Sequence, residues 1–469
     1  MQSDPTQATA VELAALIAAR KLGVVELLEA CLAAIARLNP KLNAFVTVAE
    51  DQARTAAKAL QAQLDRGETA GMLHGLPVGI KDVTLTAGIR TTYGSPLYRD
   101  HIPSEDAEAV ARLKHAGAII LGKTNTPEFA TGANTVNELF GATLNPWNTD
   151  LSPAGSSGGS AVAVAAGMVP LAQGTDFGCS IRIPAAFCGI VGIRTTAGLI
   201  PNRPMHLLWD PGQVHGPLAR TAEDAALMLD AMIGLDPLWP ISAAPPWRSA
   251  LAEVQACKDG RGLRIAYAPD IAGFGVDAEV EEVCRKAATD LRQAGALVDE
   301  IDFDASEGFL AYKTLRGQWM VGQQLDRMAL LSKFGPNLRG NLEEGLALSV
   351  SDTAAAEHAR ERVWSRFCEM FGNYDFLLTP AAPVLPYPVT ENFPAEVGGR
   401  KLTNYIDWIA PAFLVTLVGF PAGSVPAGKS KSGLPVGLQI VGPRFSEPGI
   451  LSLAKLVQLS HPIGRPSAI

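Results

Sequence analysis

The sequence predicts an α/β protein with a large mixed, mostly parallel β-sheet that helices cover on both faces. Short apolar runs, broken by glycine and proline, alternate with helical stretches between residues 75 and 200. That alternation is typical of buried strands joined by helices. The chain also holds 45 glycines and 33 prolines among its 469 residues. This content indicates many tight turns and close backbone approaches rather than a helical bundle.

The N-terminal part carries two helical patterns within residues 8–40, in which apolar side chains recur at helical spacing. We expect these two helices to pack on the outside of a larger body. Strands and helices then alternate. The expected strands lie at residues 77–80, 118–121, 168–171 and 189–193, and the expected helices at residues 105–116 and 160–166.

The second half of the chain begins with a proline-rich connection at residues 236–250. The elements expected after it are a strand at 263–267, a helix at 280–294, a strand at 296–298, long helices within 311–372 and a strand at 374–379. No boundary divides the chain convincingly. A single domain over residues 1–469 is therefore the simplest organisation.

Composition and charge exclude several classes of protein. Hydrophobic residues make up 48% and charged residues 18%, which excludes a disordered chain. The net charge of -8, with no basic block, argues against a nucleic-acid partner. No apolar run is long enough to span a membrane, and from the polar, acidic first residues we expect no secretory signal. Six scattered cysteines without metal-binding spacing indicate a reducing compartment. We expect a cytoplasmic monomer or homodimer.

Two short motifs match known patterns but lie in the wrong context. Residues 117–124 fit the phosphate-loop pattern, yet the residues between the glycines read as a buried strand instead of a flexible cradle. Residues 155–159 fit the G-x-S-x-G nucleophile elbow, yet the preceding segment is rich in turn residues and is not a strand. We therefore expect neither nucleotide binding nor an elbow serine.

A lysine at the end of an expected strand is the first candidate for chemistry. Lys81 follows the apolar residues 77–80, and burial disfavours an ammonium group, so its pKa would fall and it could act as a base. The alternative is an ordinary lysine whose ammonium reaches the surface and pairs with Asp82.

Two small-residue segments are the second and third candidates. Residues 152–160 lead directly into an apolar helix, so this loop should be buried and shaped, whereas the alternative is a flexible linker. Residues 174–184 place Ser180 in a tight turn, where successive N–H groups can point at one oxyanion. The alternative is an ordinary turn that pairs Asp176 with Arg182.

Together these three segments, in this order, resemble the amidase signature family. The motifs are Gly-Ile-Lys-Asp at residues 79–82, Gly-Ser-Ser-Gly-Gly-Ser at 155–160 and Asp-x-Gly-x-Ser-Ile-Arg at 176–182. The resemblance covers nearly the whole chain. It implies the amidase signature fold, with a core signature region at about residues 70–220 and a more variable substrate-pocket region at about 230–400.

The resemblance also implies a Ser-Ser-Lys triad without metal or cofactor. Lys81 stands at the position of the base, Ser156 at that of the bridging serine in a cis peptide, and Ser180 at that of the nucleophile; Ser157 is one residue out of register for the bridge. The implied oxyanion hole is formed by the backbone of Phe177, Gly178, Cys179 and Ser180, and the implied substrate contacts are Ala130, Thr131, Gly132 and Ser157.

Cys179 departs from the family pattern, which usually has glycine at this position. A glycine with positive φ would be strained as cysteine, and the thiol could instead line the acyl pocket. A catalytic cysteine is the alternative, although no histidine lies nearby in sequence to activate it.

The expected function is that of a metal-independent serine hydrolase that cleaves the C–N bond of a small-molecule amide through an acyl-enzyme. Aryl amides, anilides, alkyl amides and carbamates (a urethanase activity) all fit. One alternative is the A subunit of a glutamyl-tRNA amidotransferase, although residues 311–345 show no obvious carboxylate-binding cluster. The other is a catalytically silent binding protein, against which the intact Lys81, Ser156 and Ser180 argue.

The substrate class is expected to be apolar or aromatic if bulky side chains line the cleft. The candidates Met205, Trp209, Trp319, Trp408 and Phe413 could equally belong to the core. A small polar diamide would need an arginine or aspartate in the pocket, and the sequence alone places none there.

Overall fold

An 11-stranded sheet forms the centre of the computed structural model, which describes residues 4–466. Its strands, in spatial order, are β1 (Phe45–Val48), β3 (Ile119–Thr124), β2 (Pro77–Lys81), β6 (Leu171–Asp176), β8 (Val214–Ala219), β7 (Val191–Arg194), β14 (Ala422–Lys429), β15 (Pro435–Val441), β11 (Phe376–Pro380), β9 (Arg264–Tyr267) and β10 (Leu297–Glu300). Two small hairpins pair β4 (Val136–Asn137) with β5 (Gly141–Ala142) and β12 (Glu396–Val397) with β13 (Arg400–Lys401).

The sheet is mixed, as predicted, but its parallel share is smaller than the sequence suggests. Parallel pairing joins β3 to β2 and β2 to β6, and again β11 to β9 and β9 to β10. The other six pairings are antiparallel. For the pairing of β14 with β15, the physical reason is the length of the segment that connects them. The turn at Ser430–Leu434 is too short for the crossover that a parallel pair would need.

Helices cover both faces of this sheet. They are α1 (Ala10–Ala18), α2 (Val24–Leu42), α3 (Glu50–Asp65), α4 (Glu108–His115), α5 (Gly158–Ala165), α6 (Arg182–Cys188), α7 (Ala222–Met232), α8 (Ala250–Ala256), α9 (Ala278–Asp290), α10 (Gly308–Gln324), α11 (Pro336–Leu346), α12 (Val350–Phe371), α13 (Ala410–Leu417) and α14 (Glu447–Ser460). Gly437 faces Ala186 of α6, whereas Gly423 faces Ile450 of α14. These two glycines occupy positions of opposite parity in the β14–β15 register, so α6 and α14 lie on opposite faces.

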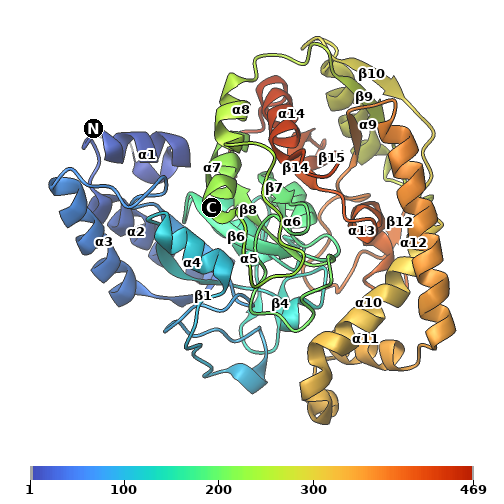
Figure 1. The fold of residues 1–469 in the computed structure, drawn as a ribbon, viewed down its shortest axis with the longest axis horizontal. Helices are drawn as coiled ribbons and strands as arrows, with labels where there is room; N and C mark the ends of the chain where they lie inside the picture. The colour runs from blue at the N-terminus through green and yellow to red at the C-terminus, as the bar shows by residue number, and fades with distance from the viewer. Residues whose placement is uncertain (1–3, 467–469) are drawn as a thin grey trace.

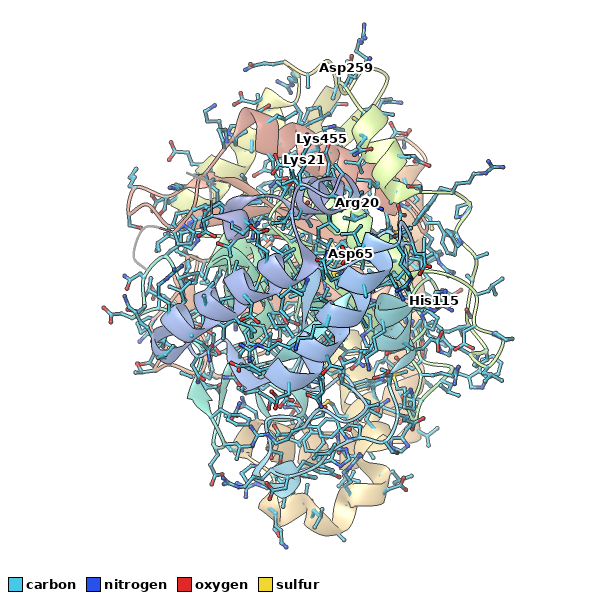
Figure 2. The ribbon with its side chains drawn as sticks, turned by 90° about the vertical axis from the view of Figure 1, so that its left-hand side faces the viewer. Arg20, Lys21, Asp65, His115, Asp259 and Lys455 are labelled. Atoms are coloured by element: carbon cyan, nitrogen blue, oxygen red, sulfur yellow. The ribbon has the colours of Figure 1, made fainter. Side chains whose placement is uncertain are left out.

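The two N-terminal helices pack on the outside of the molecule, as predicted. In Figure 1, α1 and α2 (blue), the two helices predicted within residues 8–40, lie on one side of the sheet, and α10 to α12 (yellow to orange) lie on the opposite side. Figure 2 looks from the N-terminal side and shows α2 and α3 next to each other, with Asp65 at the end of α3. No helix within residues 4–466 is long and apolar enough to cross a membrane.

Residues 117–124 form a strand instead of a phosphate loop, as predicted. The segment Ile119–Thr124 is the buried strand β3, and the Lys123 ammonium donates to Thr86 Oγ1 and Thr91 Oγ1 at 3.0 and 2.9 Å and to the Thr84 carbonyl. Burial lowers the pKa of Lys123 to about 7. This lysine therefore holds the 84–91 loop in place and does not point into a phosphate cradle.

Candidate active site

Lys81 ends the buried strand β2, and its side chain is completely buried. Its Nζ lies 2.6 Å from Ser156 Oγ and 2.9 Å from Thr175 Oγ1, at the end of the neighbouring strand β6. The Thr175 carbonyl lies 3.5 Å from the same nitrogen. Adjacent parallel strands thus bring the amine against hydroxyl groups instead of carboxylates.

Burial sets the protonation of this amine. It lowers the pKa of Lys81 to about 7, although the negative charge of buried Asp176 acts in the opposite direction. Asp82 does not pair with Lys81: its carboxylate accepts hydrogen bonds from the backbone and hydroxyl of Thr92. The interpretation of Lys81 as a surface lysine paired with Asp82 is therefore wrong: Lys81 is buried, and successive residues of an extended chain point to opposite faces.

The loop at residues 152–160 is buried, as predicted. The peptide bond between Gly155 and Ser156 is cis. The loop runs into α5, which begins at Gly158, and a Cβ at Gly159 would lie 2.3 Å from the Asn125 nitrogen. Only glycine allows this close approach of two backbones, which places Ser156 beside Lys81.

Residues 177–180 form a turn that is held through its carbonyl groups. The Phe177 carbonyl accepts from the Tyr312 hydroxyl at 3.3 Å, and the Gly178 carbonyl accepts from Arg182 Nη2 at 2.7 Å. The carbonyls of Cys179 and Ser180 accept backbone N–H groups from Ile183 and Ser157, both at 3.0 Å.

The N–H groups of the same four residues remain unengaged: none finds an acceptor within residues 4–466. Each of the four carbonyls of the turn accepts a hydrogen bond from the protein, whereas its four N–H groups are available to a ligand. Free N–H groups in a turn that is held through its carbonyls are compatible with the predicted oxyanion hole.

Ser156 and Ser180 line one small cavity of about 40 Å³. Most of its walls are apolar or aromatic; they include Phe129, Ala130, Thr131, Gly132, Phe177, Cys179, Tyr312, Arg316, Trp319, Met320, Tyr405 and Ile409. A second cavity of about 390 Å³ shares Ala130, Thr175 and Trp319 with the first, so the two adjoin.

Of the predicted substrate contacts, Ala130, Thr131 and Gly132 lie on the small cavity, whereas Ser157 does not. Ser157 is completely buried, and its Oγ donates to the Thr175 carbonyl at 3.2 Å. The prediction for Ser157 is therefore wrong. Its position as the residue before α5 turns the side chain away from the cavity and toward strand β6.

For several bulky residues, the sequence left open whether they line the cleft or belong to the core. In the structure some of them line a cavity and others belong to the core. Trp319 lines both adjoining cavities, and Met205 lines the larger one. Trp408 is completely buried and stacks on Phe187, so it belongs to the core. Trp209 is 77% exposed and lines a separate cavity of about 540 Å³ that contains none of the triad candidates.

Sequence reasoning missed four residues of the site. Thr175 contacts the Lys81 amine, and Tyr312, Arg316 and Tyr405 line the small cavity. Thr175 lies next to the recognised Asp176 and could have been found as the neighbour of a strand end. The other three come from residues 308–405, where helical spacing alone does not show which face meets the cavity.

Asp176 and Arg182 form a buried ion pair directly behind the turn. Arg182 Nη2 lies 2.8 Å from Asp176 Oδ1, and both side chains are completely buried. The alternative interpretation of this segment, an ordinary ion-paired turn, is thus correct for these two residues and compatible with the oxyanion geometry. Arg182 also donates to the Gly178 carbonyl, so the pair holds the turn in place.

We expect Asp176→Asn to destabilise the fold by about 3–5 kcal/mol, because it leaves the Arg182 guanidinium buried without a counter-charge. Urea unfolding of the two proteins measures this difference. Glu307→Gln, at a partly exposed pair with Arg362, is the matched control and should change the unfolding free energy by less than about 1 kcal/mol. Equal effects at the two positions would contradict the structural role of the buried pair.

Cys179 occupies the turn without backbone strain, because its φ is not in the positive region. Its thiol is buried, points toward the Gly155 carbonyl at 3.5 Å, and has its pKa raised by burial. Of the two possibilities left open for Cys179, backbone strain therefore does not apply, and the residue lines the cavity. The raised pKa also disfavours a thiolate nucleophile.

Cys179→Gly should retain at least a tenth of the activity, since the oxyanion donors belong to the main chain. The kcat/KM of the variant for an anilide measures the effect. Complete loss of turnover with an unchanged melting temperature would instead assign the thiol a chemical role.

Within residues 4–466, no group of three or more histidine, cysteine, aspartate or glutamate side chains could hold a metal ion.

Comparisons with known proteins show the family of this chain. The model of the Amidase family matches residues 26–451, so the chain belongs to the amidase family. It is 36% identical over 439 residues to an acylamidase of Rhodococcus erythropolis, covering 92% of this chain and 91% of the relative. It is 35% identical over 473 residues to the A subunit of the glutamyl-tRNA(Gln) amidotransferase of Agathobacter rectalis, covering 95% and 92%.

A solved structure shows the same fold. The crystal structure of a bacterial aryl acylamidase of the amidase signature family superimposes with a TM-score of 0.90 at 28% identity, covering 97% of this chain and 96% of the other. The large mixed sheet with helices on both faces is therefore the amidase signature fold, as the resemblance implied.

Proposed function

We propose that this amidase family member is a serine hydrolase that cleaves the C–N bond of a small-molecule amide or carbamate through an acyl-enzyme on Ser180. The observation that carries the proposal is the 2.6 Å contact between the buried Lys81 amine and Ser156 Oγ, on a cavity that Ser180 shares. A serine hydroxyl is a weak nucleophile until a base takes its proton. Lys81, with a pKa of about 7, is neutral often enough at physiological pH to supply that base.

The first half of the reaction follows from this arrangement. Neutral Lys81 accepts the Ser156 proton while Ser156 accepts the proton of Ser180, whose oxygen attacks the amide carbonyl. The carbonyl oxygen becomes negatively charged and is held by the unengaged N–H groups of residues 177–180. Loss of one such donor costs about 3 kcal/mol of transition-state stabilisation.

The second half reverses the proton path. Ser156 delivers a proton to the leaving nitrogen and regains one from Lys81, so the C–N bond breaks and the amine leaves. Water then attacks the acyl group on Ser180 and releases the acid. Walls of Phe129, Phe177 and Trp319 favour substrates with an apolar or aromatic part.

The test is hydrolysis of a simple anilide by the purified single chain, followed by release of aniline. A catalytically silent protein would release none. A burst of aniline equal to the enzyme concentration, before slower steady release, would support an acyl-enzyme whose breakdown limits turnover. Absence of cleavage over a panel of anilides, alkyl amides and carbamates would overturn the proposal.

A second candidate function is that of an amidotransferase component, favoured by the 35% identity to such a protein. It would act on glutamine and depend on partner proteins. The same purified chain, incubated with L-glutamine, distinguishes the two functions. Ammonia release from glutamine above aniline release from the anilide would favour the amidotransferase, whereas anilide cleavage without glutamine cleavage favours the independent amidase.

A further inference from the structure

Arg316 is a buried arginine on the wall of the small cavity, and it has no acidic partner. It lies on α10 with 7% of its surface exposed, and it lines the same cavity as Ser156 and Ser180. The other two arginines that are buried near the turn, Arg182 and Arg194, both lie within 4 Å of Asp176. No carboxylate within residues 4–466 lies at ion-pair distance from Arg316.

The neighbours of Arg316 are neutral and use only part of its hydrogen-bonding capacity. Its guanidinium donates to Asn341 Oδ1 and, at 2.7 Å, to the Tyr405 hydroxyl oxygen. Asn341 Nδ2 donates to the same hydroxyl at 2.9 Å. The Tyr312 hydroxyl is a further neutral neighbour of the guanidinium. A guanidinium has five N–H donors, so donors remain even when all three neighbours each use one.

The Tyr405 hydroxyl also has a hydrogen-bond donor that no described residue uses. It accepts two hydrogen bonds, from Arg316 and Asn341, and its own proton has no acceptor among the described residues. Tyr405 lines the cavity beside Arg316. This corner of the site therefore presents a positive charge and further donors, and no carboxylate of the described residues forms an ion pair with them; the negative charge that acts on Tyr405 is that of Glu344.

An unpaired buried cation is costly unless a ligand neutralises it. We propose that Arg316, with Tyr405, binds a carboxylate on the acyl part of the substrate, so that the preferred substrates are amides of short dicarboxylic acids or of similar acids with an anionic end. The inference rests on the proposed function and narrows its substrate class. The sequence alone could not place an arginine in the pocket, whereas in the structure Arg316 lines it.

The two cavities indicate which part of the substrate carries the charge. Arg316 lines the 40 Å³ cavity and not the adjoining 390 Å³ cavity. A volume of 40 Å³ corresponds to about three water molecules, which suits a short chain. The acyl group stays attached to Ser180 after the amine has left, so the smaller cavity suits the acyl part and the larger one the departing amine and its aromatic group.

The test compares two anilides that differ only in charge. Succinic acid monoanilide and butyranilide share the leaving aniline and the chain length, but the first ends in a carboxylate and the second in a methyl group. We expect the wild-type kcat/KM for the acid to exceed that for the neutral anilide by about tenfold or more, the range of a charge-assisted hydrogen bond. Arg316→Gln should abolish or invert this ratio, and Arg316→Lys should retain part of it.

Arg339→Gln is the matched control, because Arg339 is exposed on α11 and lines neither cavity. It removes the same charge from the protein and should leave the ratio unchanged. A wild-type ratio of one or less, or an Arg316→Gln ratio equal to that of the wild type, would overturn the inference. If Arg316→Gln fails to fold, Tyr405→Phe replaces it and should lower the ratio by severalfold; an unchanged ratio in that variant would also count against the inference.

A binding measurement separates this inference from the proposed function. Calorimetric titration of succinic acid monoanilide into the Ser180→Ala chain should show binding that Arg316→Gln weakens by about tenfold or more. Cleavage of butyranilide without preference for the acid would leave the proposed function standing and reject the carboxylate site. Binding of the acid through Arg316 without cleavage of either anilide would reject the proposed function and support the site.

Discussion

Ser180→Ala is expected to lose on the order of 10⁶-fold in kcat, the size of effect seen when a serine nucleophile is removed. The fold should be unaffected. Ser180 is only partly buried, and the group that holds the neighbouring loop is its carbonyl, which accepts the Ser157 N–H. A steady-state assay with the anilide and a thermal melt of the same preparation measure both quantities.

Ser157→Ala is the control for this variant. Ser157 Oγ donates to the Thr175 carbonyl and does not line the cavity, so its removal should lower the melting temperature slightly and leave most of the turnover. Retained activity in Ser180→Ala with a normal melting temperature would place the nucleophile elsewhere, with Cys179 the next residue to replace.

The second large effect concerns Lys81 and pH. If this amine is the base, kcat/KM should rise with pH, tenfold per unit, and level off above about 7, where Lys81 is neutral. The sign follows from the charge: protons bound below the pKa remove the lone pair that Ser156 needs. Lys81→Met should abolish the rise and nearly all the rate. Lys81→Arg should not restore activity, because a guanidinium stays protonated throughout this range.

Lys123 also has its pKa lowered to about 7, so a second variant must identify the titrating group. Thr175→Val removes the hydroxyl that accepts from Lys81 Nζ at 2.9 Å and does not touch Lys123. Loss of an acceptor disfavours the ammonium form, so the midpoint of the profile should move to lower pH. A midpoint that stays in place in this variant, or an active Lys81→Arg enzyme with the wild-type profile, would exclude Lys81 as the base.

The sequence was sufficient to predict those features for which the local sequence pattern and the expected burial of the segment indicate the same structure. Lys81 could be placed because it ends an apolar run, and the 152–160 loop because small residues lead into an apolar helix. The strand at 119–124 could be distinguished from a phosphate loop because Ala-Ile-Ile-Leu favours a buried strand over a flexible loop.

The features that the sequence could not supply depend on long-range packing. Strand direction at the centre of the sheet is set by which distant segments pair, as β7 does with both β8 and β14. Arg316 reads as an ordinary helical arginine until α10 is packed against the cavity, and Ser157 differs from Ser156 only by the direction in which the loop turns it. Periodicity records which residues share a face and not what that face meets.

In the proposed mechanism, the main chain and the side chains of residues 177–180 have different roles. The N–H groups are free for the oxyanion, while the side chains of Phe177 and Cys179 wall the cavity and Phe177 stacks on Trp319 with ring centroids 4.2 Å apart. Selection can therefore exchange the residues at 177 and 179 without removing a single catalytic donor. In the proposed mechanism, the segment that binds the oxyanion is also the one in which new substrate preferences can arise by single substitutions, so a library limited to these two positions is the shortest route to altered specificity.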